Sequence, residues 1–424
     1  MMNEKDNSNL TLAIEHSELK VPEIRFKGFS GDWENKNIGC VLAEIKRPIE
    51  LLDDQLYQLV TVKRRNEGVV PRITLKGKDI LVKNYFSIKA GDYLISKRQV
   101  VHGANGLVPN NLNNAVVSNE YLIAIDSDDI TTRFWTIISK RSEMHRLFFI
   151  SSYGVDIEKL VFDVADWKNR TITIPQITEQ KTITNYFQKL DTLINQHQQK
   201  HNQLSNIKKA MLGKMFPKAG ATIPEIRFKG FSGEWERSTL AEIGNTYTGL
   251  SGKTKDDFGY GQGRFVTYMN VFSNVISDET LVEPINIDST QTEVKAGDVF
   301  FTTSSETPEE VGMSSVWVYD IKNIYLNSFC FGYRPKRKFN CYYFAYMLRS
   351  PSFRAKITFL AQGISRYNIS KTKVMDTTVA IPCLEEQIKI GNYFQKLDNL
   401  INQHQQQISK LKQIKQACLN KMFV

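Results

Sequence analysis

The chain has 424 residues, of which 41% are hydrophobic, and a formal net charge of +10. This length favours two modules with connectors over a single core, and the basic excess is compatible with a polyanionic partner without requiring one. The five scattered cysteines argue against a zinc site or a disulfide framework, and no apolar run approaches the roughly 18 residues of a membrane span. We therefore expect a soluble, cytoplasmic protein with no metal site and no membrane contact.

The chain begins with a polar segment, residues 1–20, that has no signal-peptide core and is expected to be a flexible arm. A motif rich in proline, glycine and aromatic residues follows over residues 21–35 and returns, nearly unchanged, within the linker segment 217–237. The first copy reads VPEIRFKGFSGDWE and the second IPEIRFKGFSGEWE. This composition predicts an ordered turn that docks its rings on a neighbouring element, and we call each copy a clip.

Two strand-rich segments, residues 36–173 and 238–380, follow the clips and differ from each other at most positions. Short β-branched and apolar runs predict strands, and the expected strands are 69–75, 79–82, 93–95, 115–117, 299–301 and 315–318. Each segment also contains one pattern of helical spacing, over 132–149 and 342–359. The tetrad Lys-Ala-Gly-Asp at 89–92 returns at 295–298, at nearly the same distance before an Ile-Pro step, so the two segments are predicted to share one fold.

A long helix is predicted in each of the segments 174–216 and 381–424. Each helix starts just after an Ile-Pro step, because proline disfavours helix at the residue before it. Apolar residues recur at alternating spacings of three and four, which is the pattern of a coiled coil, and about 38 residues at 1.5 Å each give a rod of roughly 57 Å. The predicted coiled-coil and partner-contact positions are Phe187, Leu190, Ile194 and His197 in the first helix and Phe394, Leu397, Ile401 and His404 in the second. The predicted fold is α+β, with two similar domains joined by two long antiparallel helices in a pseudo-twofold internal repeat.

Polar residues occupy equivalent positions of the two predicted seams, His197 with His404 and Lys208 with Lys415. A polar group in a seam costs stability but disfavours wrong alignments, so these residues are predicted to fix the register of the coil. A metal-binding role is the weaker interpretation, since no carboxylate or cysteine cluster accompanies the histidines. Because His197 lies near the middle of its seam, antiparallel pairing should bring the two histidines together.

Sequence signatures of catalysis are missing. Residues 249–254 resemble the end of a phosphate-binding loop, but position 247 is tyrosine where that loop needs glycine. The combination of Asp32 with Glu44 and Lys46 imitates a nuclease metal site, yet the second half has no equivalent lysine, which favours coincidence. No nucleophilic triad and no dinucleotide-binding motif can be nominated, so the chain is predicted not to be an enzyme.

These features together resemble the specificity subunit of type I restriction-modification enzymes. The resemblance rests on two variable segments, each closed by Ile-Pro and then by a helix of the form Glu-Gln…Phe-Gln-Lys-Leu-Asp…Ile, from Glu179 to Ile194 and from Glu386 to Ile401. It extends from Val21 to the end of the chain. The stretch Gly363 to Ser370 also resembles a recurring part of that family's target recognition domains, whereas the first half departs from that pattern over residues 154–165.

The resemblance implies that each variable segment is a target recognition domain that reads one half of a split, asymmetric site in double-stranded DNA. The coiled coil would then fix the unread gap. Two methyltransferase subunits would dock on the helices and clips, and two ATP-dependent motor-nuclease subunits would complete the enzyme. S-adenosylmethionine, ATP and magnesium would be cofactors of those partners, and this chain would bind none of them.

A DNA reader needs side chains that match base edges and cations that hold phosphates. Such groups follow the strands after the two Lys-Ala-Gly-Asp tetrads, and the candidates are Lys97, Arg98, Gln99, His102, Asn105 and Asn111 in the first domain and Thr303, Ser304, Ser305, Arg366 and Tyr367 in the second. For each of them a solvated loop is the alternative. Basic residues on the predicted helices could contact phosphate or simply face solvent, and these are Lys140, Arg141, Arg146, Arg349, Arg354 and Lys356.

Two other classes of protein remain open. A stand-alone DNA-binding regulator with two readers would explain the duplication and the basic charge, but not why the clips and helices of the two halves match so closely. A pure scaffold protein would show no salt-dependent affinity for DNA. Co-purification with a methyltransferase subunit would separate these interpretations.

Overall fold

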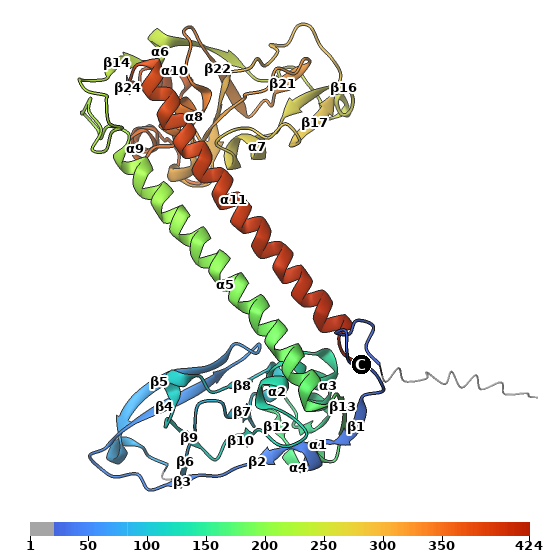
Figure 1. The fold of residues 1–424 in the computed structure, drawn as a ribbon. Coiled ribbons are helices and arrows are strands. Elements are labelled where there is room, and N and C mark those ends of the chain that lie inside the picture. Colours follow the sequence, from blue (N-terminus) through green and yellow to red (C-terminus); the bar gives the residue numbers. More distant parts are fainter. Residues whose placement is uncertain (1–20, 83) are drawn as a thin grey trace, which may run out of the picture. The chain divides into compact units, whose positions relative to one another are not determined.

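The structure is a computed structural model that describes residues 21–82 and 84–424, so the predicted arm 1–20 lies outside the described residues. The chain forms two compact units. Unit 1 holds the first half up to Asn195 together with Ile408–Val424, and unit 2 holds Gln196–Gln407. Each unit contains one globular domain and parts of both long helices, α5 (Ile177–Lys214) and α11 (Leu384–Lys421) (Figure 1).

The globular domain of unit 1 is built on two sheets. The four-stranded sheet has the order β2 (Ala43–Glu44), β10 (Tyr121–Ile125), β7 (Tyr93–Ser96) and β8 (Asn105–Leu107). The five-stranded sheet has the order β3 (Pro48–Ile49), β6 (Tyr85–Ser87), β9 (Val116–Ser118), β4 (Leu56–Lys63) and β5 (Gly68–Lys76). The short elements of this domain are β1 (Glu34–Asn37), α1 (Ile38–Val41), η1 (Gly77–Asp79), η2 (Val100–His102), η3 (Asn110–Leu112), α2 (Thr132–Ile138), α3 (Ser142–Ile150), β11 (Ser152–Tyr153), η4 (Ile157–Lys159), β12 (Val161–Phe162), α4 (Val164–Lys168) and β13 (Thr171–Ile174).

The globular domain of unit 2 repeats the four-stranded sheet and has a different second sheet. The four-stranded order is β15 (Gly244–Thr248), β22 (Cys330–Pro335), β18 (Val299–Thr302) and β20 (Ser314–Val316), beside a three-stranded sheet of β17 (Val282–Ile285), β16 (Phe258–Val266) and β21 (Ile324–Leu326). The short elements are β14 (Glu236–Thr239), α6 (Leu240–Ile243), η5 (Lys255–Asp257), α7 (Tyr268–Ser273), β19 (Ser304–Ser305), η6 (Pro308–Glu310), α8 (Cys341–Arg349), α9 (Pro351–Phe359), β23 (Tyr367–Asn368), α10 (Lys371–Met375) and β24 (Thr378–Ile381).

The two Lys-Ala-Gly-Asp tetrads form the same turn, which confirms one fold used twice. Their glycines take left-handed φ values of 90° at Gly91 and 91° at Gly297, which glycine adopts without steric cost. The carboxylate of Asp92 accepts a hydrogen bond of 2.7 Å from the backbone N–H of Lys89, and Asp298 accepts one of 2.9 Å from Lys295. Each buried aspartate also pairs with an arginine, Asp92 with Arg47 at 2.6 Å and Asp298 with Arg334 at 2.7 Å.

Several predicted elements need correction. The helix expected over 132–149 is two helices, α2 and α3, because Ser139 leaves the helix and its hydroxyl shares a buried hydrogen bond of 2.5 Å with Tyr93. The helix expected over 342–359 is likewise divided into α8 and α9. Pro351 cannot continue α8, and Ser350 instead caps α9 through the N–H of Phe353. The strand expected over 79–82 is absent from those residues, where a 3₁₀ turn ends at Asp79, and the strand expected over 315–318 ends at Val316.

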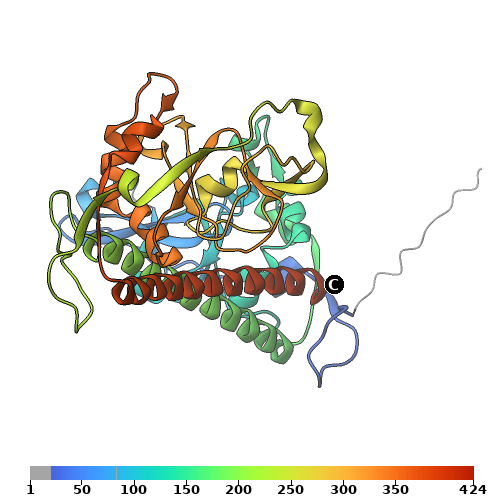
Figure 2. The same cartoon turned by 90° about the horizontal axis from the view of Figure 1, so that it is seen from above.

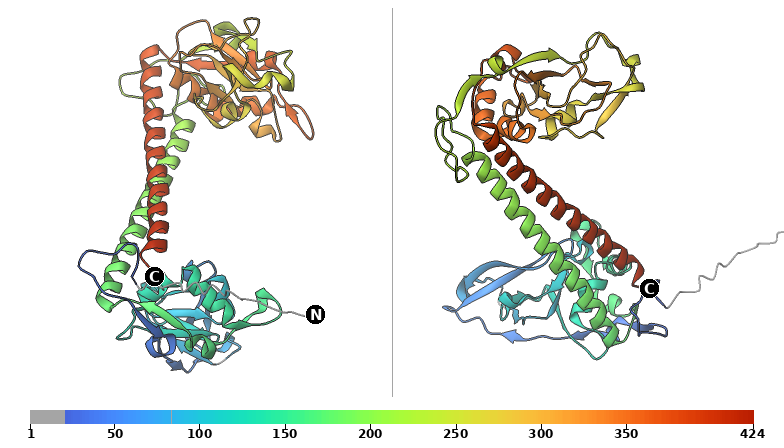
Figure 3. Two further views of the ribbon diagram at one scale, coloured as in Figure 1. Left: turned by 90° about the vertical axis from the view of Figure 1, so that its right-hand side faces the viewer. Right: turned by 45° about the horizontal axis from the view of Figure 1, so that its top comes forward.

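The two long helices run antiparallel, as predicted. In unit 1 Lys415 of α11 forms an ion pair with Asp191 of α5, and in unit 2 Lys208 of α5 pairs with Asp398 of α11 at 2.5 Å. The eight predicted coiled-coil positions are all buried or half-buried, whereas most of the residues between them are exposed. Figures 2 and 3 show α5 as one unbroken helix that leaves the first domain and α11 as one that leaves the second.

Candidate nucleic-acid interface and helix frame

Each clip docks on the start of a long helix through one half-buried arginine that pairs with a buried glutamate. Arg25 donates to both carboxylate oxygens of Glu179 at 2.8 and 2.7 Å, and Arg227 donates to both of Glu386 at 2.7 and 2.8 Å. The same guanidinium groups donate to the carbonyl oxygens of Gly31 and Gly233, which closes the turn of each clip. The predicted docking of the clip rings is confirmed, since Phe26 contacts Tyr186 and Phe228 contacts Tyr393 in α5 and α11. The repeated ion pair adds a second contact, which was not nominated from the sequence.

The residue before each clip arginine contacts the C-terminal end of the other long helix in the same unit. The N–H of Ile24 donates to the carbonyl of Lys421 at 2.8 Å, and the N–H of Ile226 donates to that of Lys214 at 2.9 Å. The clip tryptophans Trp33 and Trp235 are buried in the two cores. Each unit therefore has one clip that holds two antiparallel helices together.

A glutamine at each helix start fastens the globular domain to the helix. The side chain of Gln180 accepts from the N–H of Thr131 and donates to the carbonyl of Pro175, at 3.1 and 2.9 Å. Gln387 does the same with Asn340 and Pro382, at 3.1 and 3.0 Å. The Glu-Gln pairs that the sequence repeats thus have two functions, since the glutamate binds the clip and the glutamine binds the domain. We call the clip, the paired helices and this Glu-Gln pair the frame of each unit.

The two seam histidines meet within unit 2. Nδ1 of His197 lies 2.9 Å from Nδ1 of His404, with ring centroids 5.1 Å apart. The predicted encounter of the two histidines is confirmed. Burial lowers the pKa of His404, and the nearby His197, Lys200 and His201 lower it further.

In the first domain the predicted reading residues gather around the loop that follows β7, and its cations are already paired. Arg98 donates to Glu120 at 2.8 Å, and Lys97 donates to the carbonyl of Asn119 at 2.7 Å. The imidazole of His102 lies 3.6 Å from Glu158, which reaches over from the loop 154–160.

Two amide side chains of this loop keep unused hydrogen-bonding capacity. Within the described part of the chain, Oε1 of Gln99 and Nδ2 of Asn105 are buried without a hydrogen-bond partner. Asn105 is almost wholly buried, so it cannot meet a base edge unless the loop moves. Asn111 does not join this group, because the pairing of Tyr93 with Leu107 places it beyond the opposite end of β7.

In the second domain the structure joins two candidate segments that are far apart in sequence. Strand β19 pairs with β23, with Ser304 opposite Asn368 and Ser305 opposite Tyr367. The backbone N–H of Ile369 donates a hydrogen bond of 3.0 Å to the carbonyl oxygen of Thr303. The exposed Arg366 therefore lies beside the loop that follows β18, in one candidate surface with Tyr367.

The first domain has the equivalent contact. There the carbonyl of Lys97 accepts the N–H of Phe162 at 3.1 Å, which places the loop 154–160 beside the loop after β7. The equivalence exists although residues 154–165 depart from the sequence pattern of the second domain. Each domain thus presents a pair of neighbouring loops, 97–105 with 154–160 in the first and 303–313 with 361–368 in the second, and we call each pair the reading loops.

Not all of the nominated hydroxyls are free to read a base. Ser304 and Ser305 are buried, and the hydroxyl of Ser305 donates to the carbonyl of Thr307. The hydroxyl of Thr303 donates to the carbonyl of Phe329 at 2.9 Å. These three side chains support the loop, and Arg366 is the most exposed of the second-domain candidates.

Two of the basic helix residues are neither solvated nor free for phosphate. Arg349 donates to the carbonyls of Ser314, Val271 and Phe272, and Arg354 donates to those of Gly312 and other residues of the loop 307–313. Burial lowers the pKa of each guanidinium to about 10. Arg354 therefore holds the reading loop 303–313 in place, and Arg349 joins the start of β20 to α7.

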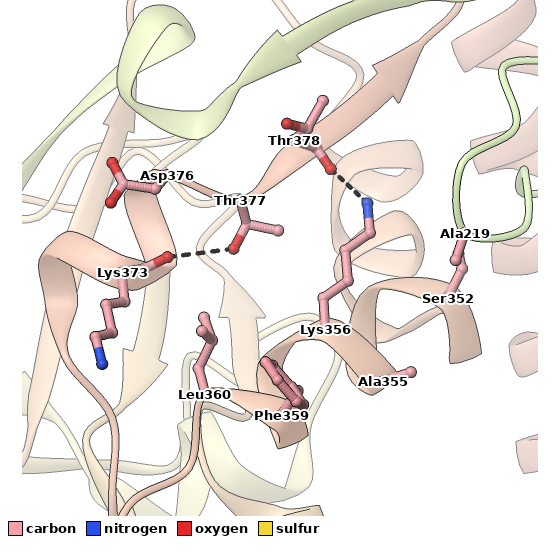
Figure 4. A pocket seen from close by; sticks show the side chains of 10 residues that line it. All are labelled: Ala219, Ser352, Ala355, Lys356, Phe359, Leu360, Lys373, Asp376, Thr377 and Thr378. Carbon is pink, nitrogen blue, oxygen red and sulfur yellow. Dashed lines mark hydrogen bonds between the residues drawn. The ribbon is translucent and has the colours of Figure 1, made fainter.

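A shallow cavity of about 640 Å³ opens beside α9 and α10 in unit 2 (Figure 4). Two of its polar side chains are engaged with the backbone: Lys356 donates to the carbonyl of Thr378 at 2.7 Å, and Thr377 donates to that of Lys373 at 3.4 Å. Nothing among its lining residues forms a nucleophile–base pair. Across residues 21–82 and 84–424 no group of three or more histidine, cysteine, aspartate or glutamate side chains is arranged to hold a metal ion.

Comparison with known proteins gives a consistent family. Residues 232–413 match the family described as Type I restriction modification DNA specificity domain. The Type I restriction enzyme MjaVIII specificity subunit of Methanocaldococcus jannaschii is 22% identical over 447 aligned residues, which cover 95% of this chain and 92% of that protein.

Solved structures share the fold. The S subunit of a type I restriction-modification system from M. genitalium has a TM-score of 0.55 at 13% identity and covers 95% of this chain and 99% of that chain. A chain from a structural study of complex assembly and conformational transition of the type I R-M system has a TM-score of 0.50 at 17% identity, with 92% and 97% covered.

Two domains of one fold, each fastened to paired antiparallel helices, are the architecture that this chain shares with the solved S subunit. Residues 232–413 carry the type I restriction modification DNA specificity domain, and the resemblance of the chain to type I specificity subunits that was predicted from the sequence is confirmed. No helix of the described residues is long and apolar enough to cross a membrane.

Proposed function

We propose that this chain is the non-catalytic DNA-recognition subunit of a type I restriction-modification complex, in which each domain reads one half of a bipartite, asymmetric site. The observation that carries the proposal is the contrast between frame and reading loops. The frame contacts of Arg25 with Glu179 recur as Arg227 with Glu386. The reading loops share one backbone contact, from Phe162 to Lys97 in the first domain and from Ile369 to Thr303 in the second, but have different side chains, which suits two half-sites of different sequence.

The reading loops supply the chemistry that base recognition needs. The guanidinium group of arginine can donate two hydrogen bonds to O6 and N7 of guanine. The side-chain amide of glutamine or asparagine can bond to N6 and N7 of adenine. Arg366 of the second domain and Arg98 and Gln99 of the first have these groups. The ion pair of Arg98 with Glu120 is at the surface, so phosphate or a base edge can replace the carboxylate at little cost.

The coiled coil is proposed to set the unread gap. Each long helix has 38 residues, which corresponds to roughly 57 Å of rod. Readers on one face of B-DNA need centres separated by about one turn, roughly 34–36 Å. A rod of this length can provide that separation even after its ends are embedded in the domains.

The frame is proposed to dock two methyltransferase subunits, one in each unit, because identical frames suit identical partners. Through them the complex would acquire two ATP-dependent motor-nuclease subunits. S-adenosylmethionine, ATP and magnesium would be bound by those partners and not by this chain, and the assembled enzyme would work in the cytoplasm.

The test is to map methylated adenines in the genome of a host with and without this chain. The proposal predicts a bipartite motif, two short half-sites around a fixed gap, that disappears when the chain is deleted. An unchanged methylation pattern, together with tight DNA binding by the isolated chain, would instead support a stand-alone regulator.

A further inference from the structure

The connector between the four-stranded sheet and the first short helix has opposite charge in the two units. In unit 1 it joins β10 to α2 over residues 126–131, and in unit 2 it joins β22 to α8 over residues 336–340, directly after Pro335 at the end of β22. Strand pairing aligns the two connectors without a gap, since Ala124 pairs with Tyr93 and Tyr333 pairs with Val299, at equivalent positions of the two sheets. Both connectors end at the residue that the frame glutamine binds, Thr131 or Asn340.

Within this alignment the four residues Asp126-Ser127-Asp128-Asp129 stand where Pro335-Lys336-Arg337-Lys338 stand in the other unit. Three aspartates give the first segment a formal charge of −3, and three cations give the second a formal charge of +3. A glutamate of the neighbouring strand, Glu34 or Glu236, is common to both units, so it does not offset the difference.

The charges of the two connectors are only partly neutralised within the protein. In unit 1 Asp129 pairs with Lys36, and in unit 2 Arg337 pairs with Glu236 at 2.9 Å. Asp128, Lys336 and Lys338 are exposed. An acidic border therefore remains in unit 1 and a basic border in unit 2.

Both borders touch the frame. Asp128 and Asp129 line a cavity of about 320 Å³ with residues 174–178, which lead into α5. Gln180 donates to the carbonyl of Asp129 at 2.6 Å. In unit 2 the backbone of the connector is held at Asn340 by Gln387, a first-turn residue of α11. A partner that covers the frame therefore meets the connector beside it.

We infer that the two frames bind the same partner subunit with unequal affinity, because that partner meets an acidic border in unit 1 and a basic border in unit 2. The inference rests on the proposed function, in which a methyltransferase subunit docks twice. One partner surface cannot complement both borders, so one docking event is favoured by charge and the other is opposed. At low salt the partner subunit then binds first to the frame that charge favours. The two affinities become equal as salt screens the charges of the borders.

The experiment titrates the full-length chain with the methyltransferase subunit of the same restriction-modification system and follows complexes of one and two partners by native mass spectrometry and calorimetry. At about 0.05 M salt the two dissociation constants should differ by about tenfold or more, and at about 0.5 M the difference should shrink to about twofold, since the Debye length falls below roughly 5 Å.

Charge-reversal variants of the connectors show which dissociation constant belongs to which unit. Lys336→Glu with Lys338→Glu should change one dissociation constant, and Asp128→Lys should change the other in the opposite direction, with each variant reducing the gap between the two. Matched controls reverse exposed charges away from the frame, Asp53→Lys in unit 1 and Lys322→Glu in unit 2. Thermal unfolding of every variant confirms that it is folded.

Equal constants at low salt, or unequal constants that the connector variants leave unchanged, would overturn the inference. A loss of DNA affinity in the Lys336/Lys338 variant with unchanged partner loading would make the basic border a DNA contact and would also overturn it. If no partner bound at all, the proposed function itself would be contradicted, which differs from two partners that bind equally.

Discussion

His197 and His404 face each other across the coiled coil with their Nδ1 atoms 2.9 Å apart. At this distance one ring donates and the other accepts, so at least one imidazole must be neutral at Nδ1. Both histidines lie in the sequence Asn-Gln-His-Gln-Gln, where apolar residues are few. A shift of the helices by one heptad would place a histidine against an aliphatic side chain, so the pair is expected to fix the register of the antiparallel coil.

The histidine pair predicts a pH dependence of stability. The pKa of His404 is lowered in the folded chain, first by burial and then by its basic neighbours. The unfolded chain therefore binds the proton more readily, and the stability contributed by neutral His404 is present above about pH 6.5 and lost as the pH falls below it. The melting temperature should decrease between about pH 7.5 and 5.5.

Replacing both histidines by leucine should raise the melting temperature and flatten this dependence, because an apolar seam has no proton to bind. Gln405→Leu, at an exposed position of α11 next to His404, is the control for the added apolar side chain and should retain the slope. An unaltered slope in the double leucine variant would show that the pH response arises elsewhere.

The clip ion pairs predict a large loss of stability when one partner is removed. Arg227→Met leaves Glu386, which is fully buried, without a cation, and this should cost about 3–5 kcal/mol in the free energy of unfolding. Arg25→Met should act equally in unit 1. Lys229→Met, an exposed position of the same clip, should cost little. The second-site change Glu386→Leu should restore part of the loss, and no restoration would argue that the arginine acts through another contact.

The reading loops predict which side chains carry DNA affinity. Arg366→Ala should weaken binding to the target site by about 1–3 kcal/mol, because an exposed arginine fork is removed. Ser305→Ala should have a small effect, since that hydroxyl donates to the backbone of Thr307. Fluorescence anisotropy at two salt concentrations measures both variants. Equal losses of DNA affinity in the two variants would show that Arg366 does not contact the DNA.

The coil predicts the length of the unread gap. Four residues inserted after Gln198 in α5, with four inserted after Gln405 in α11, add about 6 Å of helix. Mapping of methylated adenines should show the gap longer by one or two base pairs, at about 3.4 Å each, with both half-sites retained. Changed half-sites around an unchanged gap would refute the role of the coil as a spacer.

Local patterns in the sequence were sufficient to predict the parts of the fold that depend on interactions between neighbouring residues. The spacing of Phe187, Leu190 and Ile194 predicts the seam because helix periodicity is a property of neighbouring residues. The break after Ile138 was not predicted, since it depends on a hydrogen bond between Ser139 and the distant Tyr93.

The candidate interface depended more on contacts between distant segments. The pairing of β19 with β23, which joins Thr303 to the stretch around Arg366, has no local signature. Arg349 and Arg354 look like a solvated face in the sequence, but they donate to backbone carbonyl groups of segments that are distant in sequence. The repeated Arg-Glu pairs of the clips could have been found by asking which charged residues recur in both halves.

The most direct test of the account exchanges the first domain, residues 36–173, for the corresponding segment of a related subunit with a different target, in a host whose methylated adenines are then mapped. The account predicts that one half of the bipartite motif changes while the other half and the gap remain. A motif that changes in both halves, or in neither, would contradict the claim that each domain reads one half-site.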